Sequence, residues 1–312
     1  VCLLLATFAL ASCQPATPEP VIGSPVPVTA TSTRSVKSPS PTTIRFTPTQ
    51  PTSTPTVLPP DYWQSLPVIP VSLSARAREI FQEGLAMGNS PRTFSRIGDC
   101  TSAAPAFLVG FYSGYDLGEY DYLQPAVDYF HESFRRPSYA ATAGLNTAGL
   151  LTSLWTQKEC SSGESLLECQ YRLDHPAFAL ISIGTNDTYY VKRDPTVYER
   201  NLRSIIEKTI SLGILPVLAT KADNIEGDNS INATVARLAM EYELPLWNFW
   251  SSVQDLPEKG LRDTEHLTTI SYLNFTDFSQ PHALEYGMQM KNLTALQVLY
   301  FLWQELELES LP

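Results

Sequence analysis

The sequence predicts an α/β fold in which a mostly parallel sheet carries helices on both faces. Short apolar runs alternate along the chain with longer segments of helical periodicity, and most of the runs are bounded by Gly, Pro or Asp. Such runs are typical of strands that are buried on both faces of a parallel sheet. Connections between parallel strands are right-handed, and the intervening helices then cover both faces of the sheet.

Four apolar runs are predicted to be the strands. Each is four to seven residues long, as is usual for a buried strand. The runs are, in chain order, residues 94–97, 178–183, 214–219 and 244–250. In folds of this kind, ligands bind beyond the carboxyl ends of the strands. The residues that follow these runs are therefore expected to form the functional site.

Segments of helical periodicity lie between and beside these strands. Their apolar residues recur three or four positions apart, which places them on one face of a helix. In one such segment Tyr198, Leu202 and Ile206 fall on a single stripe. The segments expected to be helices are residues 75–87, 124–136, 196–212, 231–242 and 292–306.

The chain of 312 residues divides into three segments of different composition. Residues 1–12 form an apolar run that is too short to span a bilayer and ends in small residues, as the core of a signal peptide does. A Met and a basic region are absent from it, so we expect the chain to begin inside a signal peptide, unless its start is misassigned. Residues 13–60 are dominated by Pro, Thr, Ser and Val, which predicts a disordered linker. Residues 61–312 are predicted to form one globular domain.

The tetrapeptide Leu10-Ala11-Ser12-Cys13 resembles the lipobox of bacterial lipoproteins. The resemblance implies that Cys13 becomes the lipidated first residue of an exported cell-surface protein, on the extracellular side of the membrane. The lipid anchor at Cys13 would then be the only contact with the membrane. Cleavage of a plain secretory peptide nearby is the alternative.

Composition argues against several kinds of partner. The formal net charge is -11 at pH 7, and the sequence has no cluster of Lys and Arg of the kind that neutralises phosphates. Nucleic acid is therefore not expected as a partner, and charge does not favour adhesion to anionic lipid. The histidines share no short spacing, so neither a metal site nor another cofactor is predicted. They are His131, His175, His266 and His282.

Five cysteines occur in the sequence, and a chemical role or removal is expected for four of them. Cys2 would leave with the signal peptide, and Cys13 would take the lipid. Cys160 and Cys169 lie close in sequence on either side of a loop that contains Ser and Gly, and an exported compartment permits a disulfide between them. Cys100 is left unpaired, so it is either a thiol with a use or a buried, inert one.

Cys100 follows the first predicted strand in the stretch Gly98-Asp99-Cys100, where a tight turn would expose its sulfur. Acyl transfer needs a nucleophile, a base that takes its proton, a group that orients the base, and donors for the oxyanion. Cys100 is the candidate nucleophile. Thr101 and Ser102 are poorer candidates, because they would begin the following helix rather than sit at the turn.

His266 is the candidate base. Asp263 stands three residues earlier and can orient its ring when both lie on one loop turn. His282, which precedes a predicted helix, is the competing base. Its weakness is that Ser279 stands three residues before it, and the nearest acid is Asp277.

Three groups are candidate donors to the oxyanion. They are the backbone N–H of Cys100, the side-chain N–H of Asn186 after the second predicted strand, and the backbone N–H of Gly144, which has no side chain in the way. Lys221 and Asp223 follow the third predicted strand on the same expected face of the fold. They contact the substrate, or they pair with each other.

The order Gly-Asp-(Ser), Gly, Gly-x-Asn-Asp and Asp-x-x-His resembles the SGNH, or GDSL, hydrolase superfamily over nearly all of residues 90–312. The resemblance implies a flavodoxin-like three-layer α/β/α sandwich, and ester hydrolysis or acyl transfer through a covalent acyl-enzyme without a metal. It places Cys100 where the family has its nucleophilic serine. It also places Gly144 and Asn186 at the oxyanion hole and Asp263 with His266 at the C-terminal pair.

Two departures from the family pattern bear on activity. Thr264 stands where a variant of the C-terminal motif has glycine, and Cys100 replaces the serine. A thiol, with an ordinary pKa of about 8.5, ionises more readily than a hydroxyl, but a site built around serine accommodates the larger sulfur less well. Two interpretations remain. One is an acyl-ester hydrolase or acyltransferase acting on an ester-bearing small molecule or carbohydrate, and the other is a catalytically silent domain that binds polysaccharide or cell-envelope ligands.

Overall fold

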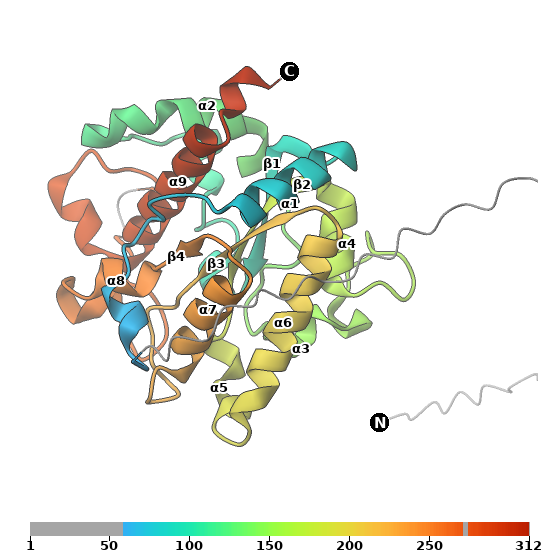
Figure 1. Cartoon of the computed structure of the whole chain (residues 1–312). Helices are drawn as coiled ribbons and strands as arrows, with labels where there is room; N and C mark the ends of the chain where they lie inside the picture. Colours follow the sequence, from blue (N-terminus) through green and yellow to red (C-terminus); the bar gives the residue numbers. More distant parts are fainter. Residues whose placement is uncertain (1–58, 271–273, 312) are drawn as a thin grey trace, which may run out of the picture. The chain divides into compact units, whose positions relative to one another are not determined.

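The computed structural model of the chain describes residues 59–270 and 274–311, and the predictions for residues 1–58, Cys13 among them, lie outside the described residues. Four strands of the described part form one sheet in the order β1-β2-β3-β4, and every neighbouring pair is parallel (Figure 1). The strands are β1 (Ser90–Gly98), β2 (Pro176–Ser182), β3 (Leu215–Ala219) and β4 (Leu246–Trp247). This parallel sheet confirms the predicted α/β fold.

Helices connect and cover the strands. The longer helices are α1 (Ala75–Ala86), α2 (Gln124–Phe134), α4 (Leu166–Asp174), α6 (Pro195–Ser211), α7 (Ser230–Glu241) and α9 (Gly287–Glu305). The shorter ones are α3 (Thr147–Leu150), α5 (Thr188–Val191) and α8 (Phe249–Val253). Short segments of 3-10 helix lie at Tyr62–Ser65, Cys100–Ser102, Val109–Tyr112, Gly118–Leu123, Ser153–Trp155, Thr185–Asp187, Pro257–Gly260, Pro281–Glu285 and Leu308–Ser310.

Local sequence explains where the longer helices begin. Helix α6 starts at Pro195, which has no N–H to leave unsatisfied in the first turn, and the side chain of Asp194 accepts a hydrogen bond from the Thr196 amide. Helix α4 begins with a capping box between Ser165 and Glu168. The predictions for α1, α2, α6 and α7 are confirmed to within two residues at each end, whereas α9 begins five residues earlier than predicted.

Helices α1 and α2 cover one face of the sheet. Phe94 of β1 and Phe178 of β2 are partners in the register, so their side chains project from the same face. Phe130 of α2 contacts both of these rings edge-on. Phe81 of α1 stacks on Phe178, with 5.3 Å between the ring centroids.

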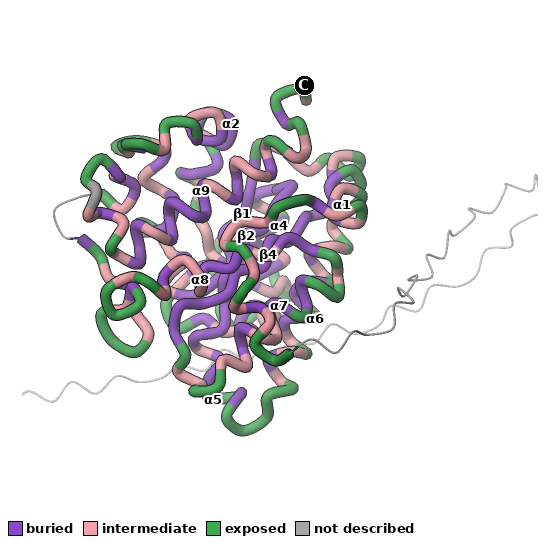
Figure 2. The backbone as a smooth tube through the Cα atoms, turned by 60° about the vertical axis from the view of Figure 1, so that its left-hand side comes forward, coloured by how far each residue is buried: buried purple, intermediate pink, exposed green. Residues whose placement is uncertain are grey.

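Helix α9 lies on the same face. Ser182 is four residues after Phe178 on β2, so its side chain points to the same side of the sheet. The Ser182 hydroxyl accepts a hydrogen bond from Lys291 of α9. Figure 2 shows the strands buried behind helices whose outer turns are exposed.

The opposite face carries α4, α6 and α7. Ser95 of β1 points to this side, and its hydroxyl donates to the carboxylate of Asp174 at the end of α4. The hydroxyls of Tyr171 on α4 and Thr209 on α6 share a hydrogen bond, and α7 contacts α6 and β3. With helices on both faces, the three-layer α/β/α sandwich that the sequence predicts is confirmed.

A further short segment pairs with the outer edge of β1. The Gly98 amide donates to the Ala140 carbonyl, and the Gly98 carbonyl accepts from the Thr142 amide. This forms an isolated parallel bridge between Gly98 and Ala141, on the edge of β1 that faces away from β2. Counting this segment in chain order, the arrangement is 2-1-3-4-5, as in flavodoxin-like folds.

The fourth predicted strand is much shorter than expected. The apolar run 244–250 was predicted to be one strand, but only Leu246 and Trp247 pair with β3, and α8 begins at Phe249. The side chain of Asn248 explains the break. It donates to the carbonyls of Trp63 and Leu66 and thereby draws the chain out of the sheet.

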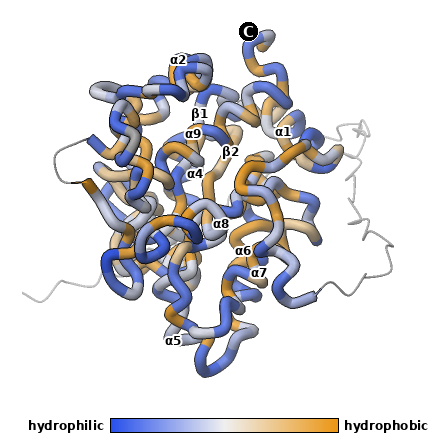
Figure 3. Tube along the Cα trace, turned by 90° about the vertical axis from the view of Figure 1, so that its left-hand side faces the viewer, coloured by the Kyte–Doolittle hydropathy of each residue, from blue (hydrophilic) through white to orange (hydrophobic). Residues whose placement is uncertain are grey.

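Hydropathy agrees with the layering. Figure 3 shows hydrophobic stretches running through the inside of the molecule and hydrophilic stretches on the outer turns of the helices. This is the alternation expected of helices that bury one side against a sheet. Among the described residues, no helix combines the length and the apolar character that crossing a bilayer requires.

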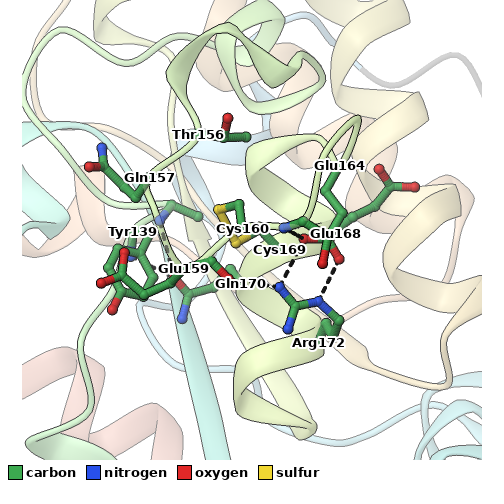
Figure 4. The surroundings of a disulfide bond; sticks show 12 residues. Tyr139, Thr156, Gln157, Glu159, Cys160, Glu164, Glu168, Cys169, Gln170 and Arg172 are labelled. Atoms are coloured by element: carbon green, nitrogen blue, oxygen red, sulfur yellow. Dashed lines mark hydrogen bonds and ion pairs between the residues drawn. A yellow bond between two sulfur atoms is a disulfide. The ribbon is translucent and has the colours of Figure 1, made fainter.

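The predicted disulfide between Cys160 and Cys169 is confirmed (Figure 4). It ties the loop before α4 to the buried face of that helix. In the same loop, Glu164 forms an ion pair with Arg172 of α4. Glu164 also lies close to the two sulfurs, in an arrangement that resembles a set of metal ligands, but the sulfurs are bonded to each other.

Candidate functional site

The candidate site lies at the carboxyl edge of the sheet, where three loops converge. Strand β1 leads into Asp99 and Cys100, and β2 leads into the turn that holds Asn186. Strand β3 leads into Lys221 and Asp223, and Asp223 accepts a hydrogen bond from Thr185 of the β2 loop. Since all strands are parallel, the motif residues that follow them meet at one edge of the sheet.

The turn after β1 is held by its own side chains. The carboxylate of Asp99 accepts hydrogen bonds from both the amide and the hydroxyl of Thr101. Gly98 is required because a Cβ at this position would lie 2.2 Å from the backbone oxygen of Ser182. Cys100 follows as a free, half-buried cysteine at the start of a 3-10 turn.

The surroundings of Cys100 keep its thiol protonated. Burial is the main cause that raises its pKa, and the negative charges of Asp99 and Glu265 raise it further. The positive charge of Lys291 acts in the opposite direction. Attack by this sulfur therefore requires a base that removes the proton.

Asp263 and His266 form the contact expected of an orienting acid and a base. The Nδ1 atom of His266 lies 2.9 Å from Oδ2 of Asp263. The backbone amides of Glu265 and His266 both donate to Oδ1 of Asp263 and lower the pKa of its carboxyl to about 2. The carboxylate is thus ionised and can only accept, so Nδ1 donates to it and Nε2 is left to take a proton.

The turn that carries His266 lies beside the end of β1. Glu265, the residue before His266, lines a cavity of about 10 Å³ together with Asp99, Thr101 and Lys291. In the described part of the chain, however, no hydrogen bond joins His266 to the sulfur of Cys100. The structure thus brings the base and the thiol to the same edge of the sheet without bonding them to each other.

The region of the competing base differs in its local partners. His282 lies in the 3-10 turn Pro281–Glu285, before α9. Asp277, the acid nearest to it in the sequence, accepts hydrogen bonds from the amide and the hydroxyl of Ser279. Both of these hydrogen bonds end on the Oδ1 atom of Asp277.

The two candidate oxyanion elements outside the β1 turn lie next to each other. The side chain of Asn186 donates to the carbonyl of Leu145, the neighbour of Gly144. Gly144 has a φ of 79°, in the left-handed region that favours glycine. Asp187 fixes the same two loops, because its carboxylate accepts from both the amide and the hydroxyl of Thr147.

Several residues at this edge escaped the sequence analysis. Asp187 belongs to the motif Gly-x-Asn-Asp, but the motif does not reveal that this residue holds Thr147. Burial raises the pKa of the Asp187 carboxyl to about 6. Glu265 lies within the Asp-x-x-His motif. Nothing in the sequence around Lys291 indicates that it is buried, since a lysine on a helix is usually exposed. Lys221, the alternative substrate contact, instead pairs with the buried carboxylates of Asp223 and Glu226.

Exposed aromatic side chains occur in the segments of the oxyanion elements. The Trp155 ring is 41% exposed and lies 3.7 Å from the position that a Cβ on Gly144 would take. Tyr189 and Tyr190 follow the Asn186 turn, on α5, and are exposed as well. Trp247, by contrast, is fully buried in the core.

No protein-family model matches the sequence, and no curated protein matches it. Among solved structures, the chain resembles two mutants of Axe2 from Geobacillus stearothermophilus. One, described as an acetyl-xylooligosaccharide esterase, has a TM-score of 0.42 at 17% identity, and the match covers 69% of this chain and 97% of that one. The other, a catalytic mutant described as an acetylxylan esterase, has a TM-score of 0.40 at 16% identity, over 68% of this chain and 95% of that one. Because one fold hosts many activities, the function has to be argued from the site.

Proposed function

We propose that the protein is an extracellular acyl-ester hydrolase or acyltransferase of the SGNH type that acts through a covalent acyl-enzyme. Cys100 attacks the ester carbonyl, His266 takes the thiol proton, and Asp263 orients the imidazole. The observation that carries the proposal is the convergence at one sheet edge of the β1 turn, the Asn186 turn and the turn of Asp263 and His266.

The oxyanion part of the proposal rests on the contact between the Asn186 and Gly144 segments. The negative oxygen that forms when sulfur adds to the carbonyl needs several fixed N–H donors. The side chain of Asn186, the amide of Gly144 and the amide of Cys100 are the donors that we assign. The hydrogen bonds that Thr147 donates to Asp187 hold the loop of Gly144 in register with that of Asn186.

The separation of His266 from Cys100 is compatible with such a mechanism. In the absence of substrate, catalytic hydrogen bonds are often long and tighten only when the reacting complex forms. In this mechanism the turn around Glu265, which lines a cavity together with Asp99 and Thr101 of the β1 turn, moves to bring Nε2 toward the sulfur.

Esterified carbohydrate is the substrate class that we propose. The exposed ring of Trp155 lies beside Gly144, and the exposed residues Tyr189 and Tyr190 closely follow Asn186 in the sequence. Aromatic faces of this kind stack on the apolar faces of sugar rings. An acetyl or other short acyl group on such a sugar would then reach the sulfur.

A catalytically silent domain that binds polysaccharide or cell-envelope ligands is the second candidate. One observation favours it: burial and two acidic neighbours raise the pKa of the Cys100 thiol, the reverse of the usual situation at a nucleophilic cysteine. Such a domain would retain the exposed aromatic side chains for binding, without turnover.

Turnover of p-nitrophenyl acetate by the purified protein separates the two candidates. The enzyme proposal expects turnover that is lost in Cys100→Ala and falls at least about a hundredfold in His266→Ala. His131→Ala is a matched control, because His131 bonds to the Tyr112 carbonyl on another part of the surface, and it should leave the rate unchanged. Absence of turnover in the unmodified protein, with new turnover in Cys100→Ser, would support the silent domain instead.

We also propose that the protein is anchored at the cell surface through a lipid on Cys13, as the lipobox-like tetrapeptide suggests. A bacterium that expresses the full precursor should incorporate labelled palmitate into the protein and retain it in the membrane fraction. Cys13→Ser should abolish both. Equal membrane retention of the two forms would exclude the anchor.

A further inference from the structure

Lys291 is a buried cation that the proposed reaction does not yet use. It lies near the start of α9 and is 1% exposed. Its Nζ donates to the hydroxyls of Thr101 at 2.6 Å, Ser182 at 3.0 Å and Ser102 at 3.4 Å. Within the described residues, it forms no ion pair with a carboxylate.

Aromatic rings complete the surroundings of the ammonium group. Nζ lies 5.2 Å from the ring centre of Phe107, 5.5 Å from that of Phe249 and 5.9 Å from that of Trp247. Cation–π contacts of this kind offset part of the cost of burying the charge. The offset is incomplete, because burial still lowers the pKa of Lys291 to about 8. An apolar side chain would fill this space at a smaller cost, so the charge calls for a functional explanation.

The three hydroxyls identify what the charge holds in place. Thr101 and Ser102 directly follow Cys100, and Ser182 ends β2 just before the turn of Asn186. A single ammonium group therefore ties the nucleophile turn to the strand that leads to the proposed oxyanion donor.

The charged groups around Cys100 define what the ammonium contributes electrostatically. Asp99 and Glu265 face the thiol as negative charges, and Lys291 is the positive charge that opposes them. Lys291 itself faces Asp99, Cys100 and Asp223. Without Lys291 the sulfur would face negative charges from the β1 turn and from the turn of His266.

We infer that Lys291 is a positioning residue, which fixes the turn of Cys100 against β2 and supplies the positive charge that opposes the two acids facing this sulfur. Its importance for catalysis rests on the proposed function. Its effect on the thiol does not, because ionisation of Cys100 can be measured without any turnover.

The test is the rate of Cys100 alkylation by iodoacetamide in the full chain near neutral pH, below the pKa of about 8 of Lys291, read by mass spectrometry of the peptide that contains Cys100. Lys291→Met should slow this labelling about tenfold, because the positive charge that favours the thiolate is lost. Lys158→Met is the matched control, because the side chain of Lys158 is 91% exposed, and it should leave the rate unchanged. An unchanged rate in folded Lys291→Met overturns the inference.

A second variant tests the role of Lys291 if circular dichroism shows that Lys291→Met does not fold. Thr101→Val keeps the shape of the half-buried side chain and removes the hydroxyl that binds Nζ. It should slow labelling near neutral pH by a smaller factor, and an unchanged rate overturns the inference. Turnover of p-nitrophenyl acetate is followed in parallel. Failure of turnover in the unmodified protein rejects the esterase, while the alkylation rates still test Lys291.

Discussion

Replacing Asp187 by Asn should remove a pH-dependent part of the stability of the protein. The Asp187 side chain is almost completely buried and accepts hydrogen bonds from the amide and the hydroxyl of Thr147. Burial is the main cause that raises the pKa of its carboxyl, from 3.8 to about 6, and the charge of Asp99 adds to the rise. The folded state thus keeps this proton at pH values at which the unfolded chain has already lost it.

The magnitude follows from the two pKa values. A rise from 3.8 to about 6 is about 2 units, which corresponds to about 3 kcal/mol of unfolding free energy. Between these pKa values the folded state binds more protons than the unfolded state. The contribution of Asp187 to the unfolding free energy is therefore largest below about pH 4 and falls as the pH rises to about 6. The amide that Asp187→Asn introduces does not ionise and still offers Thr147 an acceptor oxygen, so the variant should lack this slope.

Unfolding in urea, followed by tryptophan fluorescence from about pH 4 to about pH 7, measures the effect. The stability of wild type minus that of Asp187→Asn should fall by about 2 to 3 kcal/mol over this range. Asp194→Asn is the control, because hydrogen bonds from Thr196 lower the pKa of this exposed carboxyl, so its contribution changes mainly below about pH 4. Its difference curve should be nearly flat over this range. Parallel curves for wild type and Asp187→Asn would refute the reasoning.

Three further substitutions test the site. Gly98→Ala should lower the unfolding free energy by at least about 2 kcal/mol in urea, because its Cβ would meet the Ser182 carbonyl at 2.2 Å; a stability within error of wild type would contradict the close approach. Asp263→Asn should lower kcat for p-nitrophenyl acetate about a hundredfold or more with little change in KM, because the imidazole loses its orienting acceptor; an unchanged kcat would exclude the pair. Trp155→Ala should raise KM about fivefold for an acetylated sugar but not for p-nitrophenyl acetate, and equal effects on both substrates would exclude a sugar contact at this ring.

The sequence predicted the strands that are continuous and buried. Strands β2 and β3 are fully buried apolar runs, and β1 is buried from Thr93 to its end, so these runs stand out against their flanking turns. The run 244–250 was assigned wholly to one strand, because a short apolar run does not distinguish a strand from a buried helix. The pairing of Ala141 with Gly98 escaped notice, since a single bridge leaves no periodic pattern.

The residues of the candidate site were likewise predicted only where a local sequence pattern marks them. Cys100, Asn186 and the pair of Asp263 and His266 were named because each lies in a short motif of characteristic spacing. Lys291 was not named, because its partner Thr101 is 190 residues away in the sequence. Contacts of this kind depend on how α9 docks on the sheet, and no local pattern encodes them.

The charges around Cys100 determine which form of thiol chemistry this edge can support. A cysteine that attacks as a preformed thiolate needs surroundings that lower its pKa, whereas here burial, Asp99 and Glu265 raise it against the single opposing charge of Lys291. The thiol must therefore give up its proton during the attack, and the acceptor has to be a base that is held in place by another group. His266, oriented by an Asp263 that stays ionised because the pKa of its carboxyl is about 2, meets that requirement. A sulfur at this position would thus work by general-base catalysis, as a serine does, and the rate should depend on His266 at every pH at which the thiol remains protonated.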